Sequence, residues 1–202
     1  ISQARAWRAG ADPIRLDAVR HLPPSFVRAY REALSGPEEP AIVYGEIFEG
    51  NTVRLARAAS EYGLDHTFDF PLHYALVDVF CRGADARVIA AVLSGDSAYA
   101  PGSVHLSFLD NHDLPRIRTA CGGDEQQVAA AMELMLALRG IPVITYGTES
   151  GLVGQTETEA RSDMDFERVA PVGRVIQEGL ARRRSQPAIA RAPTVTASAS
   201  QD

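Results

Sequence analysis

The sequence predicts an α/β fold in which short parallel strands alternate with amphipathic helices. Two patterns carry this prediction. Five short apolar runs are separated by longer stretches whose apolar residues recur at helical spacing. The cores of the strand runs are apolar, as expected for parallel strands whose two faces are both covered. The five β–α units follow one another along 202 residues, which is long enough for a domain with a sizeable core.

The first two strands are each expected to end on an acidic residue. They are residues 13–17 (PIRLD) and 41–46 (AIVYGE). A helix over 25–34 follows the first strand, since its apolar residues recur every three or four positions. A second helix over 52–62 follows the second strand and is closed by Gly63.

Three further units complete the alternation. The clearest helix is expected at 124–139, because its apolar residues recur at helical spacing and Gly140 follows as a stop. The remaining strands are expected at 66–70, 104–109 and 142–146, and the remaining helices at 72–81, 86–93 and 168–184.

Five units are too few to close a parallel barrel, which needs eight strands and typically ~250 residues. The chain is therefore either the C-terminal part of a (β/α)₈ TIM barrel, with the first three strands missing, or an open α/β sheet. We expect residues 1–190 to form this partial domain and residues 191–202 to form a tail or the start of a following β domain. The chain begins at Ile1 rather than at Met, so secreted and cytoplasmic locations both stay open.

Composition narrows the range of partners. The formal net charge is −6, which argues against a nucleic-acid partner. No apolar run approaches the ~18 residues of a membrane-spanning helix, so no membrane partner is expected. Both properties are compatible with a neutral sugar polymer.

The cysteines and several histidines are expected to be structural. Cys81 and Cys121 have no metal-ligand spacing, and we expect a pair of buried free thiols. His66, His73 and His105 lie outside any catalytic pattern and are expected to be satisfied structural residues.

Acidic residues at the strand ends carry the chemical signal. Asp17, Glu46 and Asp113 each lie at or just beyond the C-terminal end of a predicted strand. Because these ends open on one face of a parallel barrel, the three carboxylates are expected to converge there. Glycoside hydrolysis needs one carboxyl to attack the anomeric carbon and another to donate a proton. Helix caps or surface ion pairs explain one isolated acid, but three at successive strand ends favour catalysis.

Four segments resemble motifs of the α-amylase family (glycoside hydrolase family 13). Residues 14–21 (IRLDAVRH) are similar to its nucleophile motif and residues 44–48 (YGEIF) to its general-acid motif. Residues 108–113 (FLDNHD) resemble its third-carboxylate motif, and residues 140–149 (GIPVITYGTE) its last barrel strand. The motifs occur in the family's order, and the resemblance extends from about residue 10 to about residue 190.

The resemblance implies a retaining enzyme that hydrolyses or transglycosylates α-1,4-linked glucans such as starch and maltodextrin. Asp17 would be the nucleophile that forms a covalent glucosyl-enzyme intermediate. Glu46 would act as the acid and then as the base. Asp113 would bind hydroxyls of the distorted sugar. The chemistry requires no cofactor.

Further binding residues follow from the same motifs. Arg15 would hold Asp17 in its charged form and oriented, and His112 would hydrogen-bond the sugar that Asp113 binds. Arg20 and His21 would line the leaving-group side, and Arg161 matches a family arginine that contacts the donor-side sugar. The backbone carbonyl of His21 would help to hold a structural calcium whose other ligands precede Ile1.

The family's first motif and the β-sandwich that usually follows the barrel are not found in this chain. The expected partners are therefore an oligo- or polysaccharide substrate and the missing N-terminal part of the same barrel. Two other functions stay open. One is an isomerase that forms disaccharides of the trehalose or sucrose type on the same site. The other is an amylase-like protein that binds carbohydrate without turnover, which the presence of all three acids disfavours.

Overall fold

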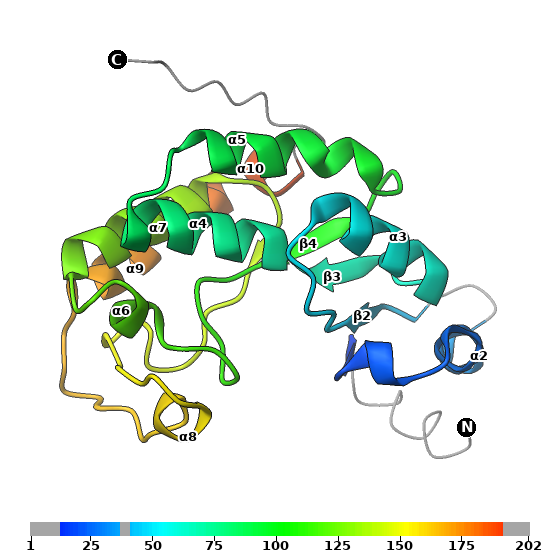
Figure 1. The fold of residues 1–202 in the computed structure, drawn as a ribbon, viewed down its shortest axis with the longest axis horizontal. Coiled ribbons are helices and arrows are strands. Elements are labelled where there is room, and N and C mark those ends of the chain that lie inside the picture. Colours follow the sequence, from blue (N-terminus) through cyan, green and yellow to red (C-terminus); the bar gives the residue numbers. More distant parts are fainter. Residues whose placement is uncertain (1–12, 37–40, 192–202) are drawn as a thin grey trace.

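The computed structural model describes residues 13–36 and 41–191, and it places helices around a single parallel sheet (Figure 1). Residues 192–202 of the predicted tail lie outside the described residues. The strands are β1 (Ile14–Leu16), β2 (Val43–Gly45), β3 (His66–Phe68), β4 (Val104–Ser107) and β5 (Ile141–Pro142).

Each strand pairs in parallel with the one before it, in the order β1-β2-β3-β4-β5. The register sets Arg15 beside Tyr44 and Thr67 beside His105. Within the described residues the strand order never reverses, unlike the order in a doubly wound sheet, which has a switch point. All five C-terminal strand ends therefore lie at the same edge of the sheet.

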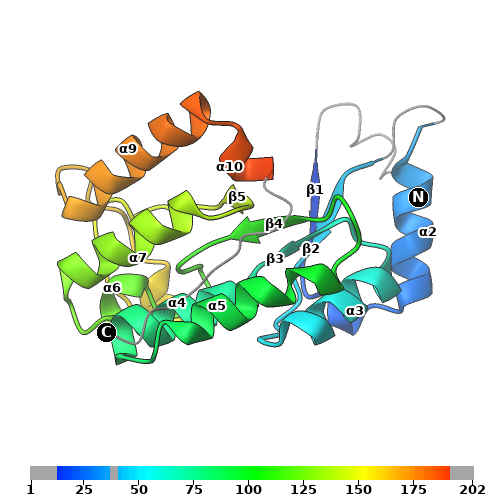
Figure 2. The ribbon, with the colours of Figure 1, turned by 90° about the horizontal axis from the view of Figure 1, so that it is seen from above.

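Long helices connect the strands, and Figure 2 shows α3, α4 and α5 following the sheet along one side. The long helices are α2 (Pro24–Leu34), α3 (Thr52–Tyr62), α4 (Phe70–Arg82), α5 (Arg87–Ser94), α7 (Glu125–Ala137) and α9 (Pro171–Ser185). The short ones are α6 (Ile117–Ala120), α8 (Glu157–Ala160), α10 (Ala188–Arg191) and the 3₁₀ turns η1 (Val19–His21) and η2 (Gly95–Ala98).

Capping residues set several of these boundaries. The side chain of Asn51 accepts from the Arg54 amide at the start of α3, and Gly63 ends the helix with φ 68°. The predicted strand over 66–70 stops at Phe68 because the side chain of Asp69 caps α4. Helix α3 has the predicted bounds.

The predicted strand over 142–146 is wrong in its extent. Strand β5 ends at Pro142, and the Val143 amide then donates to the Ser107 carbonyl over 2.8 Å. Two residues later, the Thr145 hydroxyl donates to the backbone carbonyl of Asp110. The chain thus leaves the sheet early to meet the loop that follows β4.

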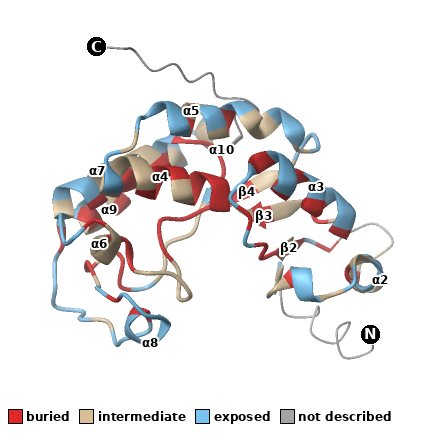
Figure 3. Ribbon diagram, viewed as in Figure 1, coloured by how far each residue is buried: buried red, intermediate tan, exposed pale blue. Residues whose placement is uncertain are grey.

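Two buried clusters hold the helices on the sheet, and Figure 3 shows the buried positions on the inner faces of the helices. The larger cluster joins α4, α5, α7 and α9 through residues such as Leu76, Met132 and Ile176. The smaller one packs α2 and α3 on the first two strands through Val43 and Leu55. Full burial of one such side chain contributes roughly 1.5–3 kcal/mol, so these clusters give the strand ends a firm support.

The expectation of free thiols is wrong, because Cys81 and Cys121 form a disulfide. Cys81 lies in the last turn of α4, and Cys121 directly follows α6. Packing of α6 against α4 brings the two Cα atoms to 4.2 Å. The bond therefore ties the loop that follows β4 to the helical layer.

His73 and His105, two of the three histidines expected to be structural, are buried against aromatic rings. His73 stacks on Phe108 with ring centroids 4.9 Å apart, and burial lowers its pKa to about 4. His105 meets Tyr99 edge-on at 4.3 Å, and burial lowers its pKa as well. His66 is half-buried on β3.

Among residues 13–36 and 41–191, no helix has the length and apolar character needed to span a bilayer.

Candidate active site

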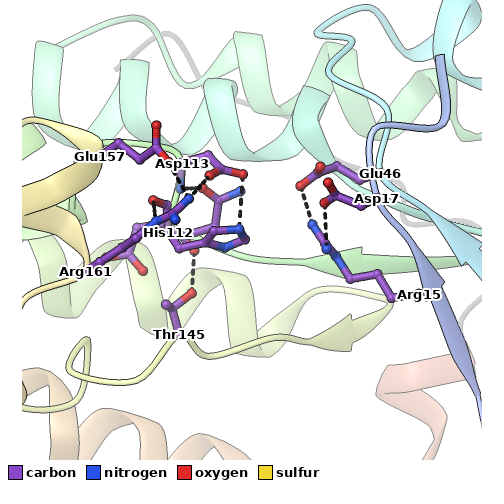
Figure 4. A network of polar contacts seen from close by, with 10 residues as sticks. Arg15, Asp17, Glu46, His112, Asp113, Thr145, Glu157 and Arg161 are labelled. Carbon is purple, nitrogen blue, oxygen red and sulfur yellow. Dashed lines mark hydrogen bonds and ion pairs between the residues drawn. The ribbon is translucent and has the colours of Figure 1, made fainter. Parts of the chain in front are cut away.

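Two groups of polar side chains lie at the C-terminal ends of the strands (Figure 4). The first group joins β1 to β2. The guanidinium of Arg15 binds Asp17 through Nη1 and Glu46 through Nη2, each over 2.8 Å. The two carboxylates predicted to act together are thus held by one cation.

Local backbone geometry places these three residues. Arg15 and Asp17 are two positions apart along an extended chain, so their side chains project to the same side. The Glu46 amide donates to the Leu16 carbonyl over 3.0 Å, and the Glu46 carbonyl accepts from the Val19 amide over 3.2 Å. These two bonds fix the end of β2 against the end of β1.

Ala18, directly after Asp17, has left-handed backbone geometry with φ 44°. For a residue with a Cβ atom this conformation costs about 1–2 kcal/mol. It turns the chain from β1 into η1 immediately after the carboxylate. Backbone strain of this kind persists where the surrounding structure fixes it, as it does at many functional sites.

The first two carboxylates differ sharply in exposure. The side chain of Asp17 is 69% exposed, whereas that of Glu46 is 5% exposed. The Arg15 guanidinium lies 5.6 Å from the centre of the Phe68 ring, which restricts its movement. One carboxylate is therefore open to an incoming ligand, and the other is shielded.

The second group is built on the loop after β4. The Asp113 amide donates to the side chain of Asn111, which shapes the turn. The carboxylate of Asp113 is 2.8 Å from Nη2 of Arg161 and 3.2 Å from Nε2 of His112. Nε of Arg161 also donates to the His112 carbonyl over 3.2 Å. The structure thus brings three predicted binding residues together.

Arg161 reaches this loop from the end of α8. Thr156 and Glu159 form a capping box at the start of that helix, and Glu157 pairs with Arg161 over 2.6 Å. In Figure 4 the carboxylates of Glu46 and Asp113 point toward the same space between the two groups.

Arg20 and His21 follow in η1. Arg20 pairs with Glu49 over 3.2 Å, and Glu49 is nearly buried. The backbone amide of Asn51, together with Arg54 and Arg20, lowers the pKa of Glu49. Sequence reasoning missed Glu49, although its position three residues after Glu46 on the same strand-end loop is a usable signal. The His21 side chain is exposed.

A structural calcium at the His21 carbonyl stays a prediction. Among residues 13–36 and 41–191, no group of three His, Cys, Asp or Glu side chains is placed to hold a metal ion. The backbone carbonyl of His21 would supply one of the six to eight ligands that calcium takes.

Asp110 and Arg116, two buried residues that follow β4, were not predicted as site residues from the sequence. Asp110 is buried and accepts from the Ile117 amide and the Thr148 hydroxyl, and burial raises its pKa. Arg116, three residues after Asp113, is fully buried. Asp110 stands within the FLDNHD motif, but nothing in the sequence marks Arg116 as buried.

Known proteins resemble this chain in sequence. The family model "Alpha amylase, catalytic domain" matches residues 12–186. A beta/alpha-amylase from Paenibacillus polymyxa is 33% identical over 164 residues, which cover 78% of this chain and 13% of that protein. A cyclomaltodextrin glucanotransferase from Bacillus sp. (strain 38-2) is 32% identical over 187 residues, covering 90% of this chain and 26% of that protein.

Solved structures share the fold. The alpha-amylase from Geobacillus thermoleovorans, complexed with acarbose, superimposes with a TM-score of 0.84 and 26% identity. The match covers 93% of this chain and 44% of that one. A cyclic alpha-maltosyl-(1→6)-maltose hydrolase from Arthrobacter globiformis gives a TM-score of 0.83, 26% identity and the same coverage. The chain spans less than half the length of each of these relatives.

Proposed function

Since the chain belongs to the α-amylase family of glycoside hydrolases and transglycosylases, we propose that it carries the catalytic carboxylates of a retaining enzyme acting on α-1,4-linked glucans. The observation that carries the proposal is the pairing of Asp17 and Glu46 on one guanidinium at adjacent strand ends. Retaining glycosidases hold their two carboxyl groups ≈ 5–5.5 Å apart, and a shared arginine is compatible with that separation.

In the proposed reaction, Asp17 attacks the anomeric carbon while Glu46 protonates the departing glycosidic oxygen. A glucosyl ester on Asp17 results, and the leaving chain carries the proton. Glu46 then removes a proton from water, or from a sugar hydroxyl, as that oxygen displaces Asp17. Water gives hydrolysis and a sugar hydroxyl gives transglycosylation. The exposure of Asp17 and the shielding of Glu46 support this division of roles.

Asp113 accepts hydrogen bonds from hydroxyls of the distorted sugar, and His112 binds the same ring. Arg161 holds the carboxylate of Asp113 and contacts the donor-side sugar. Arg20 and His21 lie on the leaving-group side, where Glu49 holds the guanidinium of Arg20. The arrangement of two polar groups facing one space supports these assignments (Figure 4).

We also propose that the five strands form the C-terminal part of an eight-stranded barrel. Within the described sheet, β1 pairs with β2 alone and β5 with β4 alone, so each keeps one open edge. An eight-stranded barrel closes such edges, and the first three strands would come from the N-terminal part of the same barrel. A structural calcium would then take the His21 carbonyl and further ligands from that part. Without it, the 202 residues are expected to aggregate, which light scattering would detect.

The test uses the full-length protein and maltoheptaose, with proton NMR to follow the first product. Retention predicts that the α-anomer appears before mutarotation. Asp17→Asn and Glu46→Gln should each lower kcat by roughly 10⁴-fold or more, as for other catalytic-group removals. Asp85→Asn and Glu61→Gln make the same changes at exposed sites and should leave kcat unchanged.

Near-normal turnover by either active-site variant would overturn the assignment. An initial β-anomer would rule out the retaining mechanism. Chromatography of the products from starch, maltose and sucrose separates the rival activities. New disaccharides formed from maltose or sucrose, with no action on starch, would indicate the isomerase, and binding of starch without turnover would indicate the non-catalytic protein.

A further inference from the structure

Arg116 is fully buried, which is rare for an arginine unless it is paired. It lies three residues after Asp113, directly before α6. The proposed chemistry gives it no role. Its contacts nevertheless reach Ala160, the neighbour of Arg161, which pairs with Asp113.

The guanidinium of Arg116 binds two backbone carbonyls on other loops. Nε donates to the Ala160 carbonyl and Nη2 donates to the Tyr146 carbonyl, each over 2.8 Å. The guanidinium also lies 5.0 Å from the centre of the Tyr146 ring. One side chain thus joins the loop after β4 to the loop after β5 and to α8.

These contacts hold both flanks of Arg161. The residue before it is Ala160, whose carbonyl Arg116 binds. The residue after it is Ser162, whose carbonyl accepts from the Tyr146 hydroxyl over 3.2 Å. Arg116 therefore reaches one flank directly and the other through Tyr146.

Close packing reinforces the connection. The Arg116 amide donates to the Gly154 carbonyl over 2.9 Å. A Cβ atom at Gly154 would lie 2.5 Å from the Ala160 amide nitrogen, so α8 rests directly on this glycine. Movement at Arg116 would therefore be transmitted to α8, which Arg161 directly follows.

A simple ion pair with Asp110 does not account for this geometry. Nη1 of Arg116 is 3.6 Å from the Asp110 carboxylate and makes no hydrogen bond to the described residues. The two shorter contacts are to carbonyls. A planar guanidinium can serve two acceptors at fixed angles, whereas a lysine ammonium is a single point charge.

We propose that Arg116 is a positioning residue that holds Arg161 against Asp113, acting through Ala160 and Tyr146. The effect on turnover rests on the proposed glucan chemistry, but the positioning itself does not. Arg161 in turn pairs with Asp113, and Asp113 lies three residues before Arg116 on the same loop.

The first test needs no activity. Amide hydrogen exchange is measured by mass spectrometry on the full-length protein and on Arg116→Met, Arg116→Lys and Arg118→Met. Exchange over residues 157–161 should rise about tenfold in both Arg116 variants, the effect expected when hydrogen bonds to a charged group are lost. Arg118→Met is the matched control, because Arg118 binds the Gly151 carbonyl and Glu125 instead of α8.

Arg116→Lys keeps a cation beside Asp110 but cannot reproduce the two-acceptor geometry of the guanidinium. It therefore distinguishes a loss of positioning from a failure to fold. Unchanged exchange over 157–161 in a folded Arg116→Lys protein would overturn the proposal. So would an equal rise in Arg118→Met.

The second test is a double-mutant cycle on maltoheptaose. Arg116→Lys and Arg161→Met should each lower kcat/KM about tenfold or more, and the double variant should be no worse than Arg161→Met. Multiplicative losses would show that Arg116 acts independently of Arg161 and would refute the proposal. An inactive wild-type protein would refute the proposed function, while the exchange experiment would still decide the positioning.

Discussion

The disulfide between Cys81 and Cys121 should contribute substantially to stability. The two residues are 40 positions apart in sequence. Closing a loop of this length restricts the unfolded chain, and the chain-entropy relation gives about 4 kcal/mol at 25 °C. The double variant Cys81→Ser/Cys121→Ser should therefore unfold at a markedly lower urea concentration.

The assay is urea unfolding of the full-length protein followed by circular dichroism. Wild-type protein is measured with and without a dithiol reductant, beside the double-serine variant. Reduction should bring the wild-type free energy of unfolding to within about 1 kcal/mol of the variant, because both then lack the same cross-link. Thiol titration of the denatured, non-reduced protein should find neither cysteine free.

Two results would refute this reasoning. Titratable thiols at Cys81 and Cys121 in protein prepared without reductant would show that the bond is not formed. A wild-type protein that loses less than about 1 kcal/mol on reduction would show that loop closure contributes little.

Two further predictions concern buried charges. Arg139→Met should lower the free energy of unfolding by roughly 3–5 kcal/mol, because Asp69 and Asp96 both pair with Arg139 at 2.5 Å and would be left without their cation. Urea unfolding at pH 7 measures this loss, and a loss below about 1 kcal/mol would contradict the prediction. The pKa of His73 is about 4 in the folded chain, below its ordinary 6.5. Between pH 6.5 and pH 4 the unfolded chain therefore binds a proton at His73 that the folded chain does not bind. The free energy of unfolding should fall by roughly 3 kcal/mol as the pH drops through this range. His73→Phe should flatten part of this decline, leaving the share due to His105, and an unchanged pH dependence in the variant would contradict the assignment.

Local sequence signals were sufficient for most elements. Apolar spacing and the glycine stop at Gly63 placed α3 correctly. The extent of β5 could not be predicted in this way, because Thr145 leaves the strand to bind the Asp110 carbonyl. That contact joins residues 35 positions apart and has no local signature.

The candidate site likewise contains some residues that local sequence features mark and others that they do not. Asp17, Glu46 and Asp113 could be predicted as candidate site residues because strand ends and motifs are local features of the sequence. Arg116 could not, since its contacts depend on which loops meet in space, whereas Glu49 lies three residues after Glu46 and was overlooked. The disulfide is a third case, because it depends on the packing of α6 against α4.

The covalent role of Asp17 can be measured directly. The full-length protein is incubated with 5-fluoro-α-maltosyl fluoride, whose fluorine at C5 slows breakdown of the glycosyl-enzyme, and its peptides are then analysed by mass spectrometry. The account predicts one 5-fluoromaltosyl group on the peptide that contains Asp17, and no such group in Asp17→Asn. A label on a different carboxylate, or an equal label in Asp17→Asn, would contradict the assignment of Asp17 as the nucleophile.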